Sequence, residues 1–523
     1  MRKTVKKLTA VGLTVTSVLG LVACGSSKGT TSQGTSENKE VTKPDTFTVM
    51  CDGTVVTETN GAEAFYKQLN EATGLDIKWT RPDHASYYDA VANAFNSDDT
   101  MPDVVLLSSD YYALYASNGF LWNMTDAWEH SETKNSGRLI STADNVLSAL
   151  MVNGEDGTKA MYGLSLYRGN GCCTYVKKAW LDKAGIDASK VKDVQMDFNT
   201  YYGYLKQMAQ TMGHYVISSP GFIHPEAPNT NYLPEFYQKA QYTFYKDTSG
   251  KYVDGFAQQE MKEALQRIQT AVNDGVIDKE SVNNSTANAR DKFYSTDPST
   301  ETGVFTYWAG TWANTLKTNL ANKGLDDELI AIKPIKELGA YTERIAPCWC
   351  ITSAAKNPEG IFKYFIDKML DGGDVQMLWT HGAKGTHWDD KAETVTVEKK
   401  EDQPKTYTEG QFHYLPGIEK PDQWQTKNHI DPILSIANFT NGYVGESLIP
   451  EVARENGEFF AENSQVAVPL PMTSELSNNI GDINTARTYV IAQVALGYMT
   501  VDEGMDYYNK TVGSLSNAVL KSL

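Results

Sequence analysis

Tryptophan, histidine and glycine gather between residues 379 and 388, where the chain reads WTHGAKGTHW. His381 and His387 are six residues apart, and two such imidazoles could bind a metal ion. No carboxylate stands between them at the spacing of a zinc ligand, so we expect no metal here. We expect instead that this glycine-rich loop brings Trp379, His387 and Trp388 to the edge of a binding cleft.

Aromatic side chains are abundant, with 29 Tyr and 10 Trp, and each offers a flat apolar face with a polar handle. Trp308 and Trp312 lie in FTYWAGTW, which has the pattern of a strand followed by a glycine turn. Aromatic rings can stack on the C–H faces of a sugar, whose hydroxyls then need polar partners in fixed directions. Packing in a core is the alternative role for both rings.

Three further candidates follow strands predicted near the start of the folded region. Apolar spacing predicts strands over 46–50, 75–79 and 104–107 and helices over 61–72 and 87–95. This alternation indicates an open α/β sheet, in which ligands bind beyond the carboxyl ends of the strands. Asp52 follows the first strand, and Asp110 and Tyr111 follow the third. The alternative roles are a turn residue, a helix N-cap and packing, respectively.

Several functional classes have no support in the sequence. It contains no GxxxxGK[ST], GxSxG or HExxH segment, so a phosphate-binding loop, a nucleophile elbow and a zinc-protease helix are not indicated. The formal charge of −18 disfavours nucleic acid as a partner. The 65 acidic residues leave a glycoside hydrolase open, because that chemistry needs only two facing carboxylates roughly 5 to 10 Å apart.

The first 45 residues have the pattern of export and a tether. Basic residues precede Leu8–Ala23, an uncharged run shorter than the roughly 20 residues of a membrane-spanning helix. Residues 1–23 therefore fit a signal peptide, and Leu-Val-Ala before Cys24 resembles the lipobox of bacterial lipoproteins. That resemblance implies a lipid on Cys24, and residues 24–45 fit a flexible linker. An ordinary secretory signal is the alternative.

The order of motifs in the remaining chain resembles extracellular solute-binding proteins of ABC importers. The resemblance is to the carbohydrate-binding family 1 type, which includes maltodextrin-binding and oligosaccharide-binding lipoproteins. It rests on five segments in order: MYGLSL at 161–166, YVKKAWLDKAGI at 175–186, 261–280 with its terminal GVIDKE, ITS to NPE at 351–359, and GAKGTHW at 382–388. Ser165 and Trp388 depart from the proline and tyrosine of the family pattern.

The resemblance implies an α/β, type II-like periplasmic-binding-protein fold, with two lobes, a hinge and a ligand cleft between them. The chain would cross the hinge near 165–172 and near 348–351. Tyr167 and Arg168 follow the first family segment, where relatives place polar ligand contacts. Trp312 matches a sugar-stacking position. Asp110 matches a contact to sugar hydroxyls.

The implied division of the chain has six parts in order: lipoprotein signal peptide 1–23, lipidated cysteine and linker 24–45, first part of lobe 1 46–165, first part of lobe 2 166–347, second part of lobe 1 348–440, and a C-terminal helical segment, mainly of lobe 2, 441–523. Both predicted crossings carry cysteine pairs. Cys172 or Cys173 could therefore lie near Cys348 or Cys350, and a disulfide stays open. The spacing of these pairs does not fit structural zinc.

We therefore expect a lipid-anchored protein on the extracytoplasmic face of the cell membrane. It would capture an oligosaccharide between closing lobes and deliver it to the permease subunits, as a monomer without cofactor or catalysis. The membrane contact would be the lipid on Cys24, and nucleic acid would not be a partner. The alternatives are a tethered polysaccharide-active glycoside hydrolase and a binder of peptides or another non-sugar solute. The sequence does not identify the sugar, its charge or a structural calcium.

Overall fold

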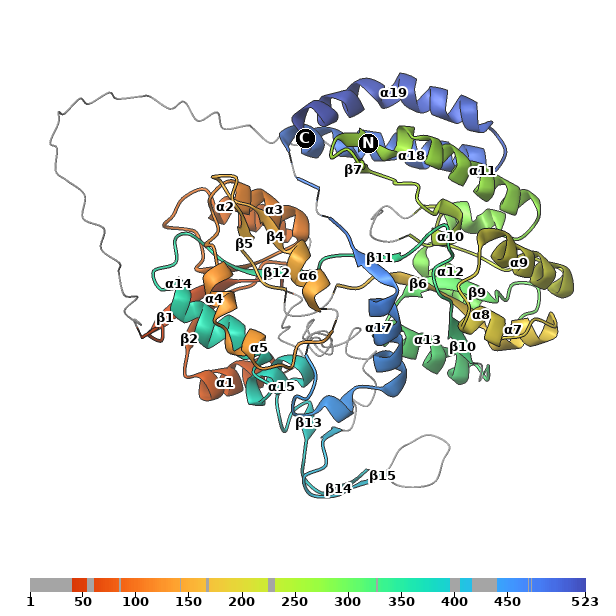
Figure 1. Cartoon of the computed structure of the whole chain (residues 1–523). Coiled ribbons are helices and arrows are strands. Elements are labelled where there is room, and N and C mark those ends of the chain that lie inside the picture. The colour runs from red at the N-terminus through yellow and green to blue at the C-terminus, as the bar shows by residue number, and fades with distance from the viewer. Residues whose placement is uncertain are drawn as a thin grey trace, which may run out of the picture. The chain divides into compact units, whose positions relative to one another are not determined.

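The first core of the molecule, called lobe 1 here, is built on a sheet with the strand order β12-β3-β1-β2. Figure 1 labels β1, β2 and β12 of this sheet. β1 (Thr46–Met50) pairs in parallel with β2 (Asp76–Thr80) and β3 (Val104–Leu107). β12 (Cys348–Ile351) is antiparallel to β3. The predicted open α/β sheet is confirmed, and a strand from a distant segment completes it.

The computed structural model describes most of the chain from residue 40 onward. The described ranges are 40–53, 61–83, 86–141, 143–165, 169–223, 231–325, 328–395, 405–415, 440–468, 470–471 and 473–523. The predicted signal peptide, linker residues 24–39 with Cys24, and the candidates Tyr167 and Arg168 lie outside these residues. Within them, no helix combines the length and apolar character needed to cross a bilayer.

Helices cover the sheet of lobe 1 with their apolar faces. α1 buries Ala62, Phe65 and Leu69, spaced for one helix face, and ends at Gly74, whose φ of 61° suits glycine. The helices and the small hairpin of this lobe are α1 (Ala62–Thr73), α2 (Tyr87–Ala94), α3 (Ser109–Ser117), α4 (Thr125–Glu129), α5 (Glu132–Asn135), α6 (Ala143–Ala149), β4 (Met151–Asn153), β5 (Lys159–Met161), α14 (Pro358–Ile361), the irregular turns η5 (Phe362–Ile366) and η6 (Asp367–Leu370), and α15 (Asp374–His381).

The second core, called lobe 2, surrounds an antiparallel sheet of β10 (Leu329–Ala331), β6 (Cys172–Lys177) and β9 (Val304–Trp308). All six residues of β6 are buried, as expected for a central strand covered on both faces. The other elements of this lobe are α7 (Lys178–Lys183), α8 (Ser189–Lys192), α9 (Phe198–Met212), α10 (Pro234–Tyr237), β7 (Phe244–Lys246), β8 (Tyr252–Asp254), η3 (Gly255–Ala257), α11 (Gln259–Asn273), η4 (Lys279–Asn283), α12 (Thr286–Phe293), α13 (Thr311–Asn322), α17 (Glu451–Glu462), α18 (Ser474–Ala495) and α19 (Val501–Ser522).

A buried ion pair ties the C-terminal helices to lobe 2. Arg487 of α18 has no exposed surface and donates to Asp254 Oδ1 over 2.8 Å. The hydroxyls of Tyr508 and Ser516, both in α19, donate to Asp254 Oδ2 over 2.6 Å each. The carboxylate thereby gains the partners that burial of a charge requires. Residues far apart in sequence are thus fixed in one core.

Two segments run side by side where the chain crosses between the cores. Leu164 pairs with Trp349 in an isolated bridge, and the backbone N–H of Arg344 donates to Asn170 O over 3.1 Å. Leu164 on the lobe 1 side and Cys172 at the start of β6 bound the first crossing. The second lies at 344–347, just before the predicted 348–351, because Cys348 already pairs with Leu107 in the sheet of lobe 1.

A third connection returns the chain from lobe 1 to lobe 2. Tyr443 packs near His381, a short turn η8 (Glu446–Leu448) follows, and α17 then packs on α13. β17 (Ser464–Val466) pairs in parallel with β11 (Tyr341–Glu343), the strand that leads into the second crossing. The domain boundaries given above stay a prediction, since the two cores alone do not define them.

The described residues after His387 include two short antiparallel ladders. β14 (Glu393–Val395) pairs antiparallel with β15 (Lys405–Tyr407). The residues that flank these strands also pair, since β13 (Trp388–Asp389) is antiparallel to β16 (His413–Tyr414). These short ladders extend from the glycine-rich loop that was a candidate for the binding site.

Candidate functional site

The registers of the two main sheets place a specific end of each sheet at the inter-lobe crossings. In lobe 1, Leu107 at the end of β3 pairs with Cys348, the first residue that β12 contributes after the second crossing. In lobe 2, Trp308 at the end of β9 pairs with Cys172, the first residue of β6 after the first crossing. The carboxyl ends of β3 and β9 therefore both lie beside the crossing segments, and residues that follow these strands are the site candidates.

The lobe 1 part of this site contains three stacked tyrosines. Tyr111, in the first turn of α3, stacks on Tyr88 with centroids 4.0 Å apart and planes 6° apart. Its ring also stacks more loosely on Tyr115, at 6.2 Å and 26°. Tyr88 Oη accepts a hydrogen bond from the backbone N–H of Ser108 over 2.9 Å. Tyr111 thus lies between two rings, and Tyr88 joins the candidates.

The two aspartates predicted for lobe 1 lie on the expected elements. Asp52 is half-buried and follows β1 at the carboxyl end of the sheet. Asp110 is the second residue of α3, and its N-cap position is held by Ser108 instead. The alternative reading of Asp110 as the N-cap is therefore wrong. Nothing about its side chain is described.

Two tyrosines of this surface, Tyr88 and Tyr115, have raised pKa values. Burial raises the pKa of Tyr88 above its ordinary value and raises the pKa of Tyr115 to about 12. A neutral phenol both donates and accepts hydrogen bonds. The surface can therefore serve a ligand's hydroxyls without adding charge.

The lobe 2 part of the site is the junction between β9 and α13. Trp308 is the last residue of β9, and Trp312 lies in the first turn of α13. Gly310 turns the chain between them with φ 65°, and its N–H donates to Asn456 Oδ1 over 2.7 Å. Tyr175 Oη donates to the same oxygen over 2.9 Å. Asn456 of α17 thus fixes the junction that carries both tryptophans.

Each tryptophan of this junction is half-buried and carries an arginine on its ring. The guanidinium carbon of Arg344 lies 4.7 Å from the ring centroid of Trp308. Arg290 of α12 lies 5.8 Å from Trp312, whose ring meets Tyr307 edge-on at 5.3 Å. Neither arginine was a sequence candidate. Arg344 could have been found, since it stands just before the cysteine pair used to predict the second crossing.

The predicted loop 379–388 needs correction in its first part. Trp379 and His381 lie on α15, and the turn starts only at Gly382. Trp379 has no exposed surface and packs edge-on against Phe65 at 4.9 Å. Its ring therefore belongs to the core of lobe 1 because the helix extends further than the glycine pattern indicated.

The rest of that loop is closed by its own side chains. Trp388 Nε1–H donates to Gly382 O over 2.8 Å, and His387 Nδ1 accepts from the N–H of Ala383 over 2.8 Å. Both side chains are buried. Gln68 of α1 bonds both the N–H and the carbonyl of Lys384. These contacts hold the loop on α1, and any ligand contact by His387 or Trp388 stays a prediction.

Among the described residues, neither His381 nor His387 belongs to a group that could hold a metal ion. His381 is buried between Tyr414 Oη, 2.8 Å from its Nδ1, and Tyr443 Oη, 3.1 Å from its Nε2. Burial lowers the pKa of His381 to about 3. In the described part of the chain, no group of three or more His, Cys, Asp or Glu is placed to hold a metal ion.

The cysteine pairs at the two crossings do not bridge the lobes. None of the five cysteines that the structure describes forms a disulfide, and all five are buried: Cys51, Cys172, Cys173, Cys348 and Cys350. Burial raises the pKa of Cys173 and of Cys348 to about 12. These thiols are therefore small packing residues with little reactivity.

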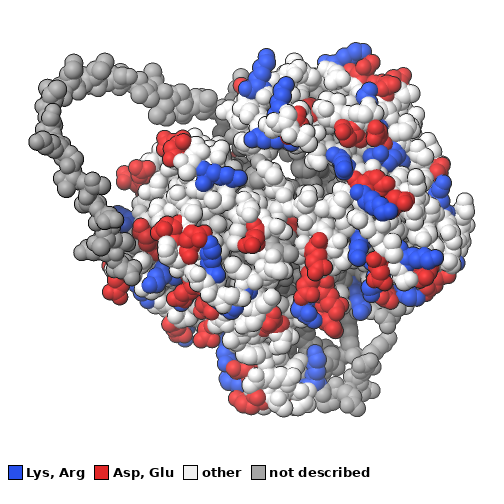
Figure 2. Space-filling model, in the orientation of Figure 1, with Lys and Arg blue, Asp and Glu red and all other residues white. Residues whose placement is uncertain are grey.

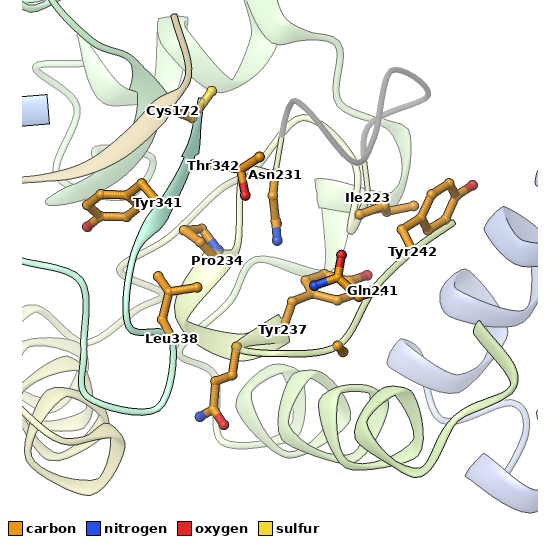
Figure 3. Close-up of a pocket in the computed structure, with 12 residues that line it drawn as sticks. Cys172, Ile223, Asn231, Pro234, Tyr237, Gln241, Tyr242, Leu338, Tyr341 and Thr342 are labelled. Atoms are coloured by element: carbon orange, nitrogen blue, oxygen red, sulfur yellow. The ribbon is translucent and has the colours of Figure 1, made fainter. Parts of the chain in front are cut away.

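A cavity of about 50 Å³ lies beside β11 (Figure 3). Tyr341 and Thr342 of β11 line it together with Asn231, Pro234 and Tyr237. Ligand pockets for small molecules measure roughly 300 to 1,000 Å³, whereas about 10 to 15 Å³ accommodates a water. The cavity can hold water but not a sugar ring, so it is not the site proposed for a ligand.

Two α/β cores joined by paired crossing segments define the fold class of two-lobe extracellular solute-binding proteins, as the sequence predicted. Structure comparison agrees over almost the whole chain. No protein-family model and no curated protein matches the sequence. Many solved structures match instead. Their sequence identities to this chain are low, so the likeness shows the fold alone.

Three solved structures illustrate the match. The N-glycan transport solute binding protein of Streptococcus pneumoniae has a TM-score of 0.58 at 16% identity, over 92% of this chain and 98% of that chain. An extracellular solute-binding protein family 1 from Alicyclobacillus acidocaldarius has 0.57 at 14% identity, over 91% and 100%. A solute-binding protein from Bifidobacterium longum infantis, described as HMO binding and ABC-transporter associated, has 0.54 at 15% identity, over 91% and 98%.

Proposed function

We propose that this protein is the lipid-anchored, extracytoplasmic component of an ABC importer that captures an oligosaccharide and delivers it to the permease. The observation that carries the proposal is the pair of aromatic groups at the sheet ends beside the crossings. Tyr88 and Tyr111 stand on lobe 1, and Trp308 and Trp312 stand on lobe 2. Aromatic faces suit sugar C–H surfaces, and closing two lobes on a ligand would couple its binding to a change of shape.

The comparisons support a binding role over a catalytic one. Three of the solved structures with this fold are described as an alginate-binding protein, an N-glycan transport solute binding protein and an HMO binding solute binding protein. A glycoside hydrolase would need an opposed carboxylate pair, whereas the rings at both sheet ends supply platforms without such chemistry. The alternative of a peptide or another non-sugar solute shares the fold, so the ligand itself must be tested.

Ligand screening tests this proposal directly. Residues 41–523 cluster as one unit, so we would screen that segment against neutral and acidic oligosaccharides by thermal shift, followed by calorimetry. A ligand that binds only the folded state raises the midpoint by mass action. We expect one glycan class to do so, with no cleavage products in the same samples. Peptides as the only ligands, or released products, would overturn the proposal.

A tryptophan variant locates the binding. Trp312→Ala should abolish most of the glycan-induced shift, because it removes a stacking face at the junction of β9 and α13. The matched control is Tyr498→Ala, which removes an aromatic ring that is 73% exposed in the turn between α18 and α19. Equal binding by Trp312→Ala and the native protein would place the sugar elsewhere.

The anchor is tested separately in the full chain. The uncharged run before Cys24 and the polar linker after it support lipidation at that thiol. Cys24→Ser should shift the protein from the membrane fraction to the medium and stop incorporation of labelled fatty acid. Retention of the variant in the membrane with labelled lipid would contradict the anchor without touching the ligand proposal.

A further inference from the structure

We infer that the captured oligosaccharide is anionic and that Arg290 and Arg344 bind its acidic groups. This inference rests on the proposed function and names the substrate class of the same site. It starts from the two arginines that lie on the tryptophan rings of the β9–α13 junction.

The first step is that neither arginine pairs with a carboxylate in the described part of the chain. Among the residues that the structure describes, no Asp or Glu oxygen lies within 4.0 Å of Arg290 or Arg344. Arginines elsewhere in lobe 2 are paired: Arg487 with Asp254 at 2.8 Å, Arg454 with Glu458 at 3.6 Å and Arg267 with Glu263 at 4.0 Å. The chain has 65 acidic residues, so partners are plentiful and the two exceptions coincide with the candidate site.

The second step concerns the hydrogen-bond donors that remain. A guanidinium carries five N–H donors and keeps its charge at all physiological pH values. Arg290 uses one donor on Tyr307 Oη, over 3.3 Å. The contacts of both guanidinium groups with ring faces use none. In-plane N–H groups on a guanidinium match the two oxygens of a carboxylate or sulfate.

The third step is that an anionic ligand must be attracted by positive side chains close to the site. The formal charge is −18, and on the face shown in Figure 2 acidic and basic side chains are interspersed rather than segregated. The general field therefore opposes an acidic ligand. Two cations beside the stacking rings, Arg344 exposed and Arg290 half-buried, supply the short-range attraction that the overall charge does not.

A purely structural role for the arginines makes a different prediction. If they only brace the tryptophan rings through cation–π contacts, their loss weakens binding of every ligand that stacks there. If they bind anionic groups, their loss weakens only ligands that carry the charge. Paired ligands that differ in charge alone therefore separate the two roles.

The experiment uses residues 41–523, oligogalacturonates, their methyl esters, and a sulfated and unsulfated pair of neutral-backbone oligosaccharides. We expect at least one acidic ligand to bind about 10-fold or more tighter than its neutral counterpart. We also expect the affinity of the acidic ligand to fall as the salt concentration rises from about 50 to about 300 mM, because salt screens the attraction between charges. The carboxylate and sulfate arms identify which anion is recognised. Equal or tighter binding of the neutral members would overturn the inference and leave the proposed function standing.

The variants are Arg290→Gln and Arg344→Gln, with Arg→Lys at each position to retain the charge. We expect each Gln variant to lose about 10- to 100-fold affinity for the acidic ligand, in line with a charged hydrogen bond, with no change for the neutral one. The Lys variants should recover part of the lost affinity for the acidic ligand. They also keep the inference testable if a Gln variant fails to fold. Lys262→Gln, which removes one positive charge on α11, is the control and should bind as the native protein does.

Two results would contradict the inference. Equal losses for acidic and neutral ligands in the Gln variants would assign the arginines a bracing role. Binding of no oligosaccharide at all, by the native protein, would remove both this inference and the proposed function.

Discussion

The ring of Tyr88 lies flat on the ring of Tyr111, with centroids 4.0 Å apart and planes inclined by 6°. The stack joins the first turns of α2 and α3, which follow different strands of the sheet. Offset stacking of this kind adds about 0.5 to 1.5 kcal/mol beyond the apolar area that it buries. The pair therefore orders the lobe 1 surface before any ligand arrives.

This stack predicts an energetic coupling between the two residues. Tyr88→Ala, Tyr111→Ala and the double variant should give a coupling of about 0.5 to 1.5 kcal/mol in the free energy of unfolding, measured with urea. The control pairs Tyr111→Ala with Tyr489→Ala on α18, which lies in the other core. That pair should be additive to within about 0.5 kcal/mol. Additivity in the stacked pair as well would show that the rings do not support each other.

A second prediction concerns the glycines of the first crossing. A Cβ on Gly171 would lie 2.1 Å from Thr342 O and 2.6 Å from Phe460 Cζ. Because one contact is with backbone, relief requires the two crossing segments to separate. Gly171→Ala should lower the free energy of unfolding by about 1 to 3 kcal/mol, as overpacking usually does.

The same substitution elsewhere should have the opposite sign. Gly203 lies inside α9, and a Cβ there would meet nothing within 4 Å. Gly203→Ala should raise the free energy of unfolding by about 0.5 to 1 kcal/mol, because alanine favours helix. Stabilisation of both variants would contradict this prediction, because it would mean that the crossing segments can accommodate a Cβ at Gly171.

Local pattern was enough to find the elements of the first sheet. Phe47 and Val49 alternate with polar residues, Gly74 ends α1, and the run at 104–107 is apolar throughout, so each signal lies within its own element. β12 was not assigned to this sheet, since its pairing with β3 joins residues far apart in the sequence. The extent of α15 was also missed, because the glycines after it suggested a longer loop.

The residues of the candidate site also divide into those that a local sequence pattern indicated and those that only the three-dimensional contacts revealed. Trp308 and Trp312 became candidates because a strand end and a glycine turn are visible in eight consecutive residues. Arg290 comes from α12, and its position over Trp312 follows from packing that no local pattern encodes. Tyr88 likewise becomes a candidate only through its contact with Tyr111. The sequence thus indicated the candidate tryptophans, and the three-dimensional contacts added Arg290 and Tyr88 to the candidates.

A third prediction concerns Glu235, a buried carboxyl beside β11. Burial raises its pKa to about 7, and Tyr341 Oη donates to its Oε1 over 3.3 Å. The unfolded chain ionises this group near pH 4.3. Between about pH 4.3 and 7 the folded state therefore holds a proton that the unfolded state has lost, and stability falls as pH rises through that window.

Glu235→Gln removes the titration and keeps a carbonyl acceptor for Tyr341. Relative to the native protein, the variant should gain on the order of 3 kcal/mol in the free energy of unfolding between pH 4 and pH 8. Urea titrations at both pH values measure the difference. Glu455→Gln, on the exposed face of α17, is the control and should show little change. Parallel pH dependences for Glu235→Gln and the native protein would contradict the assignment.

The fourth prediction concerns acid and His381. Its folded pKa of about 3 lies below the ordinary value near 6.5. On acidification the unfolded chain gains a proton that the folded state refuses, so stability falls as pH drops from about 6.5 toward 3. Between pH 7 and pH 5 this group should account for a loss of about 2 kcal/mol.

His381→Gln should lose stability at pH 7, because the imidazole bonds to Tyr414 and Tyr443 are replaced, yet it should lose about 2 kcal/mol less than the native protein on going to pH 5. His130→Gln is the matched control, since the side chain of His130 is 77% exposed. Its acid response should equal that of the native protein. An unchanged acid response in His381→Gln would mean that the buried imidazole takes up its proton in the folded state, with the two tyrosine hydroxyls accepting from the resulting cation.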